Sequence, residues 1–419
     1  MTREWNNASW MARPERPLVE RAPSRPLRLA LERHSQAPLV LHARVCNGNG
    51  GGPDKTIFRA ARHVDPTRYR VAAAYLHPRG DRGRQVIAEQ AAAFGCALHQ
   101  IEEGGAVDPR AVWRMLQLVR RLNVAVWHAH DYKSDVLGLL LRPLWPMKLV
   151  TTVHGFTNET PRTRLYARID NLTLARYDAV VAVSPPLRDH CLAHGVAARD
   201  LTYLPNGVDT DDYRPTLGQG AARRALGIAP ERLVVGCVGR LSSEKGQGRA
   251  VRTAARLARK FPQLELHLVG DGPDRARLEQ MAAQLGIAER VKFWGWQTDT
   301  PRFYEAMDVM LLPSRTEGMP NAVLEAMAMN VPTVATDVGG VRDLLDGGRC
   351  GVVVTQDETE WPAHLAPLLK DAAWRRELAA AARRRVTQRF SFRQRCAAEL
   401  DVYDKLLRVG AAGPLRRAA

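Results

Sequence analysis

The chain has 419 residues, too many for one ordinary hydrophobic core and suited to two domains of common size. Charged residues make up 25% and hydrophobic residues 45%, a balance typical of a globular protein and not of a disordered or membrane-embedded one. With 61 basic against 44 acidic residues the net charge is +17, which favours association with anionic partners.

The sequence also argues against several classes of protein. It has neither zinc-finger spacing nor an aromatic-glycine RNA-binding pattern, so its charge indicates phosphorylated substrates or an anionic membrane face, and no nucleic acid. Its longest apolar run, 136–141, is far shorter than the roughly 20 residues of a membrane span. Six scattered cysteines without metal-ligand or redox spacing fit a reducing cytoplasm. Residues 1–36 are rich in Arg and Pro, lack an apolar signal segment and are expected to form a flexible basic tail.

Apolar runs of strand length alternate with helical patterns, and this series occurs twice. The runs of the first half cover 38–45, 70–76, 124–130, 149–153, 179–183 and 201–204. Those of the second half cover 233–238, 265–269, 291–294, 309–312, 333–335 and 351–354. The alternation predicts an α/β fold of two Rossmann-like, doubly wound domains that face each other across a cleft. We expect an N-terminal domain at 37–205, a connection at 206–230 and a C-terminal domain at 231–390. A last helix, at 391–410, is expected to pack back on the first domain.

A glycine-rich loop, 47–56, follows the first predicted strand. It fails as a dinucleotide fingerprint because Pro53 holds the third glycine position, and as a Walker A loop because Asp54 replaces the last glycine. Backbone without side chains can still approach a phosphate or an acceptor closely at a helix start, and Gly51 and Gly52 suit that role.

Polar side chains end two strands of the first half. His130 and Asp131 end one of them and face the cleft in this topology, so they are candidates for contact with an acceptor. His154 ends the next strand and is followed by a glycine. A lone histidine is more often a satisfied core or surface residue, but the strand-end position favours a functional role.

The most informative segment is 314–330 in the second half. It predicts a short helix that starts near Pro320 and ends at Asn330, apolar on every side except for Glu325. A buried carboxylate needs hydrogen-bond donors, which ligand hydroxyls such as those of a ribose can provide. The helix start beyond Gly318 offers free amides to a phosphate, and Glu317 then lies where a sugar would sit.

This segment has a simpler alternative interpretation. Glu317 could close a capping box with Ser314, and Glu325 could be a surface residue. Gly318 and Pro320 argue against a helix that runs on from Ser314.

The carboxylate pair resembles a known family. Glu317 and Glu325 spell the E-x7-E element of retaining GT-B glycosyltransferases, specifically of family 4, the glycosyl transferases group 1. Residues 238–246 resemble the strand-end loop of that family, whose Arg and Lys grip the donor diphosphate, here Arg240 and Lys245. Fixed cations there would stabilise the charge that builds on the leaving phosphate. The likeness covers about residues 38–407.

The resemblance implies a role for each matching residue. Glu317 would contact the transferred hexose, with His154, Arg240 and Lys245 completing the catalytic set. The donor-binding residues would be Gly51, Gly52, Gly318, Met319, Asn321, Ala322, Val323, Glu325 and, in the base-proximal loop, Trp296. The substrates implied are a nucleoside-diphosphate sugar and a glycan or lipid-linked hydroxyl acceptor.

No metal or cofactor is expected. Asp209, Thr210 and Asp211 spell the D-x-D string of another glycosyltransferase fold, but they lie in the connection between the halves, and the family resembled needs no metal. Mixed basic and apolar residues at 113–121 and 142–148 could rest on the cytoplasmic face of a membrane, or form an ordinary amphipathic helix and loop. The alternative functions are a nucleotide-sugar epimerase of the same fold and a non-catalytic nucleotide- or glycan-binding module.

Overall fold

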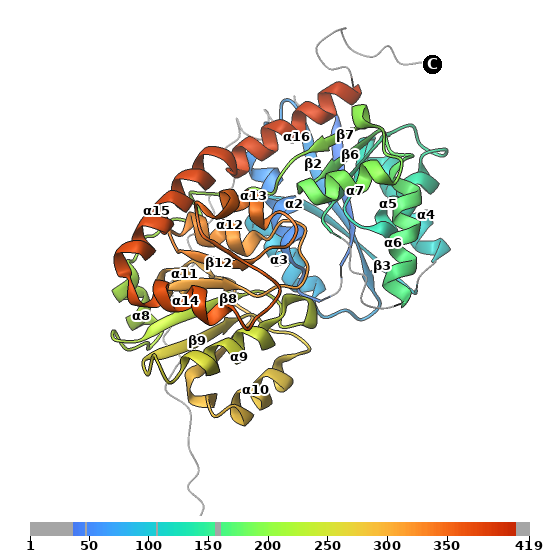
Figure 1. Ribbon diagram of the computed structural model, residues 1–419. Coiled ribbons are helices and arrows are strands. Elements are labelled where there is room, and N and C mark those ends of the chain that lie inside the picture. The colour runs from blue at the N-terminus through green and yellow to red at the C-terminus, as the bar shows by residue number, and fades with distance from the viewer. Residues whose placement is uncertain (1–36, 47, 106–107, 156–160, 408–419) are drawn as a thin grey trace, which may run out of the picture.

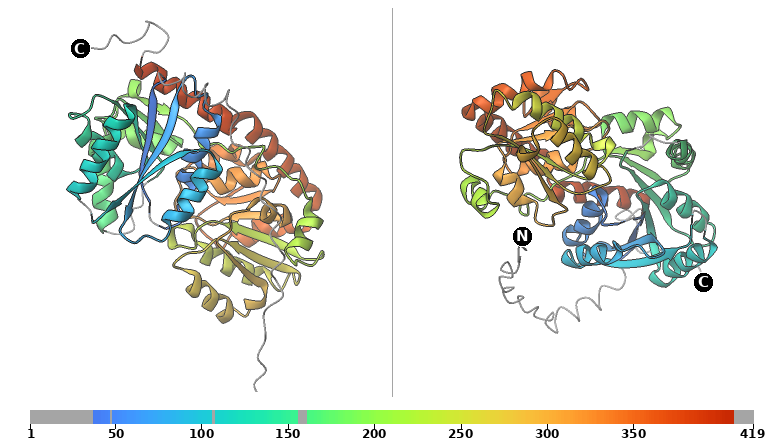
Figure 2. Two further views of the ribbon diagram at one scale, coloured as in Figure 1. Left: turned by 180° about the vertical axis from the view of Figure 1, so that it is seen from behind. Right: turned by 90° about the horizontal axis from the view of Figure 1, so that it is seen from below.

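The structure is a computed structural model that describes residues 37–46, 48–105, 108–155 and 161–407, with the backbone alone for 161–166. It contains two parallel β-sheets, each flanked by helices, in two domains that lie side by side (Figures 1 and 2). The predicted α/β architecture is therefore confirmed. The predicted tail, 1–36, and the end of the last helix, 408–410, lie outside the described residues.

The N-terminal domain is built on a seven-stranded sheet in the order β3-β2-β1-β4-β5-β6-β7, in which all pairs are parallel. Its strands are β1 Leu39–Val45, β2 Arg70–Pro78, β3 Ala97–Glu103, β4 Val124–Ala129, β5 Lys148–Val153, β6 Ala179–Ala182 and β7 Leu201–Tyr203. Its helices are α2 Gly52–His63, α3 Arg84–Ala93, α4 Pro109–Leu122, α5 Tyr132–Leu141, α6 Pro161–Leu174, α7 Pro185–Ala193 and the 3-10 turn η1 Ala198–Asp200.

The C-terminal domain repeats this plan on a six-stranded sheet in the order β10-β9-β8-β11-β12-β13. Its strands are β8 Leu233–Val238, β9 Leu264–Val269, β10 Val291–Gly295, β11 Val309–Leu312, β12 Thr333–Thr336 and β13 Val352–Val354. Its helices are α8 Gln219–Ala225, α9 Gln247–Leu257, α10 Arg275–Gln284, α11 Pro301–Ala306, α12 Asn321–Ala328, α13 Val341–Leu344, α14 Trp361–Lys370 and α15 Ala372–Arg389. Short 3-10 turns lie at η2 Ser243–Lys245, η3 Ala288–Arg290 and η4 Asp346–Gly348.

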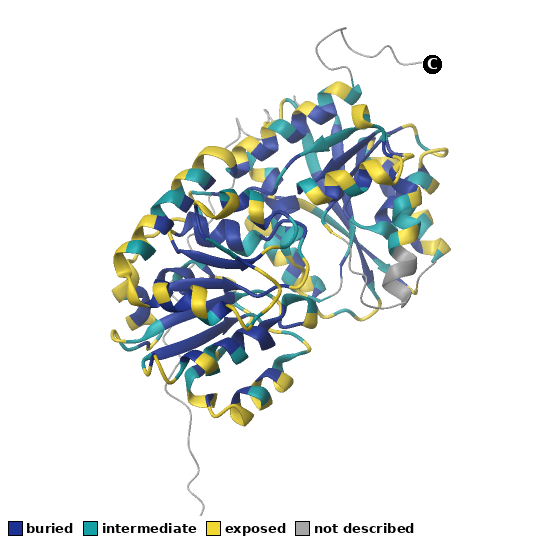
Figure 3. Cartoon of the chain, viewed as in Figure 1, coloured by how far each residue is buried: buried dark blue, intermediate teal, exposed yellow. Residues whose placement is uncertain are grey.

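The last described helix, α16 (Phe392–Leu407), leaves the C-terminal domain and runs over the N-terminal one (Figure 1). Leu400, Val402 and Tyr403 of this helix are buried against Val126 and Val150 of the first sheet. The inner strands are buried while the outer faces of the helices are exposed (Figure 3), as expected of sheets covered on both sides. Part of the first sheet is thus covered by a helix from the far end of the chain.

The sequence missed one strand, β3. Its residues, ALHQIEE, contain no continuous apolar run, and only Ile101 and Glu103 are buried. The strand lies at the edge of the sheet, where one neighbour and partial burial are enough to hold it. The other edge strands, β7, β10 and β13, were predicted because each contains a short, mostly apolar run, which β3 lacks.

Candidate active site

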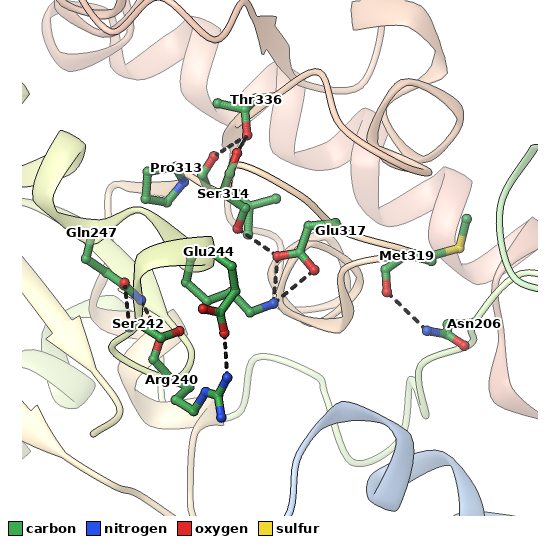
Figure 4. A network of polar contacts seen from close by, with 12 residues as sticks. Asn206, Arg240, Ser242, Glu244, Gln247, Pro313, Ser314, Glu317, Met319 and Thr336 are labelled. Atoms are coloured by element: carbon green, nitrogen blue, oxygen red, sulfur yellow. Dashed lines mark hydrogen bonds and ion pairs between the residues drawn. The ribbon is translucent and has the colours of Figure 1, made fainter. Parts of the chain in front are cut away.

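Glu317 lies in the loop that joins β11 to α12, at the carboxyl end of the second sheet, where open parallel sheets bind ligands. Neighbouring elements hold this loop by hydrogen bonds to its carbonyl groups (Figure 4). Thr336 Oγ1 donates to the carbonyl oxygen of Ser314 at 2.6 Å, and Asn206 Nδ2 of the interdomain connection donates to that of Met319 at 3.1 Å. The position of Glu317 is therefore set by the backbone of its loop.

Glycines let the loop approach both domains closely. A Cβ atom on Gly318 would lie 1.8 Å from the carbonyl oxygen of His154, and one on Gly155 would lie 3.4 Å from the amide nitrogen of Gly318. On its other side, a Cβ on Gly339 would lie 2.2 Å from the carbonyl oxygen of Glu317. Only residues without side chains fit this contact, which brings Glu317 beside His154 of the other domain.

Glu317 and Lys245 form an ion pair. Lys245 Nζ lies 2.7 and 2.9 Å from the two carboxylate oxygens, and Ser314 Oγ donates to Oε1 at 2.7 Å. The Ser314–Glu317 bond of the simpler interpretation thus exists, but no capping box forms, because helix α12 starts only at Asn321. The structure brings together a carboxylate and a cation that both belong to the predicted catalytic set.

Arg240 lies in the same network, in the loop after β8 (Figure 4). Its Nη2 donates to Glu244 Oε1 at 2.5 Å, and its side chain is 66% exposed. Burial opposes ionisation of Glu244, but the hydrogen bond and charge of Arg240, together with hydrogen bonds from Ser242 and the backbone, outweigh it and keep the pKa of Glu244 lowered. Arg240 is consequently an accessible cation at the sheet end, held next to the loop that carries Lys245.

The start of α12 presents backbone amides to the site. Its first turn has no acidic residue, and its N-cap, Pro320, offers no side-chain hydrogen bond. The side chains of Met319 and Val323 are buried in the core, so these two predicted donor-binding residues can reach a ligand only through their backbone. Ala322 is partly buried. Uncapped amides at a helix start favour an anion such as phosphate.

Glu325 is buried, so the interpretation of this residue as a surface carboxylate is wrong. Its hydrogen-bond donors come from the protein: Lys55 Nζ at 2.7 Å from Oε1 and the Tyr304 hydroxyl at 2.8 Å from Oε2. Burial acts to raise the pKa of Glu325, but the charge and hydrogen bond of Lys55 outweigh it and lower this pKa. Glu325 is an ionised, satisfied carboxylate at the domain interface.

A pocket between the domains surrounds this pair. It is lined by residues of α2, the interdomain connection, α12 and α16, namely Lys55, Thr56, Arg59, Gly207, Val208, Asn321, Leu324, Glu325 and Phe392. Gly52 borders the same contact, because its carbonyl oxygen accepts from Asn321 Nδ2 at 3.0 Å. The adjacent Gly51 is the N-cap of α2. The glycine-rich loop of one domain thus meets the start of α12 in the other.

Two predicted acceptor contacts are corrected by the structure. His130 is buried, and its two ring nitrogens are hydrogen-bonded to His42 at 2.9 Å and to His154 at 3.0 Å, so no ring nitrogen remains for a substrate. The Asp131 carboxylate accepts from the backbone amides of Val45, Lys133 and Ser134 and caps α5. Strand-end position was the only signal for these residues, and it does not distinguish a ligand contact from a helix cap.

Two further predictions concern residues outside this centre. Trp296 follows the edge strand β10 and is 40% exposed, two strands away from β8, so a contact with a base remains a prediction. Asp209 of the D-x-D string accepts from the amides of Asp211 and Asp212 and lies 2.9 Å from His63 Nε2. These contacts give Asp209 a structural role in the turn.

Sequence reasoning missed several members of the site. Lys55 lies in the loop that fails as a Walker A motif, and Tyr304 carries no local signal that marks it as a site residue. Gly339 and Gly340 follow strand β12, and this Gly-Gly pair at a strand end could have indicated a close backbone approach. The amide of Gly340 donates to the carbonyl of Gly318 at 2.8 Å.

Two doubly wound domains with a carboxylate, cations and helix amides at their shared face define the GT-B class of glycosyltransferase. Comparison with known proteins gives the same class. Residues 50–212 match the family model Glycosyltransferase Family 4, and residues 232–371 match Glycosyl transferases group 1. The chain belongs to this glycosyltransferase family and is an enzyme.

Individual relatives include named glycosyltransferases, and a solved structure with a bound nucleotide sugar has a similar fold. The lipopolysaccharide core biosynthesis mannosyltransferase LpsB of Rhizobium meliloti is 32% identical over 295 residues, 68% of this chain and 80% of that protein. A D-inositol 3-phosphate glycosyltransferase of Saccharomonospora viridis is 32% identical over 298 residues, 66% of this chain and 69% of that one. The crystal structure of Anabaena HepE in complex with UDP-glucose superposes with a TM-score of 0.75 at 23% identity, covering 88% of this chain and all of HepE.

Proposed function

We propose that this enzyme transfers a hexose from a nucleoside-diphosphate sugar to a hydroxyl of a glycan or lipid-linked acceptor, with retention of anomeric configuration. The observation that carries the proposal is the Lys245–Glu317 pair, held beside the uncapped start of α12 and next to His154 of the other domain. The cation and the helix amides suit an anionic leaving group, and the carboxylate suits a sugar rich in hydroxyl groups.

In the proposed reaction, the bond from the anomeric carbon to the leaving phosphate oxygen breaks as the bond to the acceptor oxygen forms on the same face. The acceptor proton passes to a phosphate oxygen of the leaving diphosphate. Arg240, Lys245 and the amides at the start of α12 stabilise the negative charge that develops there, while Glu317 and His154 orient the sugar. The two cations supply the positive charge, so the proposed mechanism uses no metal ion and no cofactor.

The ion pairs of the free protein define what the donor must displace. Lys245 is held by Glu317, and Arg240 by Glu244, so each cation already has a carboxylate partner. A diphosphate carries more negative charge than one carboxylate and competes for both cations. Lys245 then moves toward phosphate, and Glu317 is free to accept from sugar hydroxyls. Glu325 holds the ribose in the same complex.

The test is transfer of radiolabelled sugar from a panel of UDP-, GDP- and ADP-sugars to lipid and glycan acceptors, with product anomers assigned by NMR. Glu317→Gln keeps the shape of the side chain and should lower turnover about 100-fold while donor affinity changes little. Glu279→Gln on α10, a residue of an exposed ion pair, is the matched control and should retain full activity. Near-normal turnover of Glu317→Gln would refute the assigned role, and conversion of a nucleotide sugar to its epimer without transfer would refute the reaction.

We also propose that the enzyme works at an anionic membrane face in the synthesis of cell-surface polysaccharide or lipid-linked glycan. Within the described residues, every helix is too short or too polar to span a bilayer. Trp113 and Leu144 are 62% and 52% exposed; the exposed Arg114 is adjacent to Trp113, and the exposed Arg142 lies two residues before Leu144. Co-sedimentation with vesicles containing anionic lipid should exceed that with neutral vesicles, and Trp113→Ser should reduce it. Equal sedimentation with both kinds of vesicle would contradict the proposal.

A further inference from the structure

Three histidines form a hydrogen-bonded line that ends at His154. His42 Nδ1 lies 2.9 Å from His130 Nε2, and His130 Nδ1 lies 3.0 Å from His154 Nε2. His42 lies in β1, while His130 and His154 directly follow β4 and β5, and these three strands are neighbours in the sheet. The register pairs His42 with His128 and His128 with Val150, so positions 42, 130 and 154 lie on the same face. The line connects the interior of the N-terminal domain with the predicted catalytic histidine.

The inner end of this line faces Glu399 of helix α16. His42 Nε2 lies 3.9 Å from Glu399 Oε1 and has no hydrogen-bond partner among the described residues. The Tyr403 hydroxyl donates to the same carboxylate oxygen at 2.7 Å, and Arg395 Nη2 donates to the other at 3.5 Å. Burial acts to raise the pKa of Glu399, but its interactions with His128, Arg395, His42 and the Tyr403 hydroxyl together outweigh it and lower this pKa. Glu399 is therefore a buried anion.

Neutral histidines in such a line can carry their protons in only two consistent arrangements. Burial lowers the pKa values of His42, His130 and His154, so each ring holds one N–H group. The negative charge of Glu399 favours the proton of His42 on Nε2, the nitrogen that faces it. His42 Nδ1 must then accept from His130 Nε2–H, and His130 Nδ1 must accept from His154 Nε2–H. The remaining nitrogen of His154, Nδ1, carries a free lone pair.

We propose that Glu399 is a positioning residue that fixes His154 as the Nε2–H tautomer through His42 and His130. His154 thereby presents Nδ1 as a hydrogen-bond acceptor for a hydroxyl of the donor sugar, an inference that rests on the function proposed above. In the opposite arrangement His154 would present an N–H group, and the sugar hydroxyl would have to accept a hydrogen bond from it. The helix that crosses from the C-terminal domain thus selects the chemistry of a residue in the cleft.

A metal site is the competing explanation for this cluster. His42, His128 and His130 bring ring nitrogens within 4.8 Å of one another. The rings of His128 and His130 are stacked, however, with centroids 4.5 Å apart and planes inclined by 20°, whereas nitrogen lone pairs lie in the ring plane. His128 already bonds Tyr403 at 2.6 Å and Thr152 at 2.7 Å. A shared ion would have to break these bonds and turn the rings, so the observations favour the proton line.

The experiment reads the tautomer directly. Protein with ¹⁵N-labelled histidine is examined by long-range ¹H–¹⁵N correlation, and the His154 signals are assigned by their loss in His154→Gln. The wild type should show His154 as the Nε2–H form. Glu399→Gln should shift it toward the Nδ1–H form and lower kcat about 10-fold or more, with donor KM changed less than about 3-fold. Thr152→Val removes an equally buried hydrogen bond, to His128, outside the line; it should leave the His154 tautomer unchanged.

A second variant guards against misfolding. His42→Phe keeps a ring but cuts the line between Glu399 and His130, so it should produce the same tautomer shift, and the double variant should add no further loss. Any of four outcomes would overturn the proposal. They are an Nδ1–H form of His154 in the wild type, an unchanged tautomer in Glu399→Gln, additive losses of kcat in the double variant, and stoichiometric zinc uptake that shifts the His42 and His128 signals. The tautomer is read without substrate, so a wild-type protein without transferase activity would refute the proposed function alone.

Discussion

Lys55 of the N-terminal domain and Glu325 of the C-terminal domain form an ion pair across the interdomain pocket, with Nζ 2.7 Å from Oε1. The pair joins the glycine-rich loop region of one domain to the buried helix of the other. Glu325 is almost fully buried, whereas the Lys55 side chain is 39% exposed. This contact therefore supplies one of the two hydrogen-bond donors of the carboxylate and links the two domains.

Lys55→Met should destabilise the protein, because it leaves the Glu325 carboxylate with only the Tyr304 hydroxyl as a donor. Breaking a fully buried pair costs about 3 to 5 kcal/mol; the partial exposure of Lys55 reduces the expected loss to about 2 kcal/mol. Chemical denaturation of the variant and the wild type measures this loss in the free energy of unfolding. In a double-mutant cycle, Glu325→Gln should remove most of the effect of Lys55→Met.

Arg62→Met is the matched control for Lys55, because Arg62 lies on the same helix and pairs with Asp212 at the surface, with its side chain 49% exposed. Its loss should cost less than about 0.5 kcal/mol. Equal effects of the two substitutions would show that Glu325 does not depend on Lys55.

Gly318→Ala should separate the β11–α12 loop from the other domain. The added Cβ would lie 1.8 Å from the carbonyl oxygen of His154, so the backbone must shift. Such overpacking costs about 1 to 3 kcal/mol, and misplacement of Glu317 should lower kcat roughly 10-fold or more. Steady-state kinetics and thermal unfolding measure the two effects.

The control for this glycine is Gly220→Ala in α8, where the nearest atom to the new Cβ, in the side chain of Arg224, is 3.7 Å away. It should keep full activity and gain up to about 1 kcal/mol from helix propensity. Unchanged kinetics of Gly318→Ala would contradict the close contact at His154.

His128 should make the stability of the protein depend on pH. Burial lowers the pKa of His128 to about 3, whereas the unfolded chain takes up this proton near pH 6.5. The unfolded state therefore binds more protons between these two pH values. The contribution of neutral His128 to the free energy of unfolding is fully present above pH 6.5 and is lost as the pH falls. The loss should approach about 1.4 kcal/mol per pH unit relative to His128→Phe. Urea denaturation of both proteins from pH 8 to 5 checks it; parallel pH profiles would refute it.

Asp170 should have the opposite dependence. Burial raises its pKa to about 6, next to the buried Asp135, so ionisation is unfavourable in the folded state. The cost is absent below the ordinary pKa of an aspartate and accumulates as the pH rises toward 6. Asp170→Asn should consequently stabilise the protein by about 2 kcal/mol at pH 8 and by little at pH 4. Equal unfolding midpoints of the two proteins at pH 8 would contradict this expectation.

The fold could be predicted from the sequence because its strands are mostly enclosed and therefore apolar. Residues 309–312 lie inside the second sheet and formed a clear run, whereas the edge strand β3 pairs on one side only and needs no such run. The importance of Glu325 could also be predicted, because a carboxylate on an apolar, buried helix needs hydrogen-bond donors. Local pattern carries such information.

The partners of these residues could not be predicted, because each comes from a distant part of the chain. Nothing in the sequence near Glu325 indicates Lys55, and nothing near His130 indicates that His42 and His154 occupy both of its nitrogens. A histidine at a strand end has the same local pattern whether it faces a substrate or stands behind the residue that does. Only the strand order and the crossing of α16 decide between them.

The position of α16 also affects the order in which the enzyme matures. During synthesis β1 and β4 leave the ribosome early, while the helix that carries Leu400 and Tyr403 is translated after the whole second domain. Until then the histidine face of the first sheet remains open to water. The first domain to be translated is thus the last to be completed, because the second domain is fully translated before the helix that covers the first sheet is available.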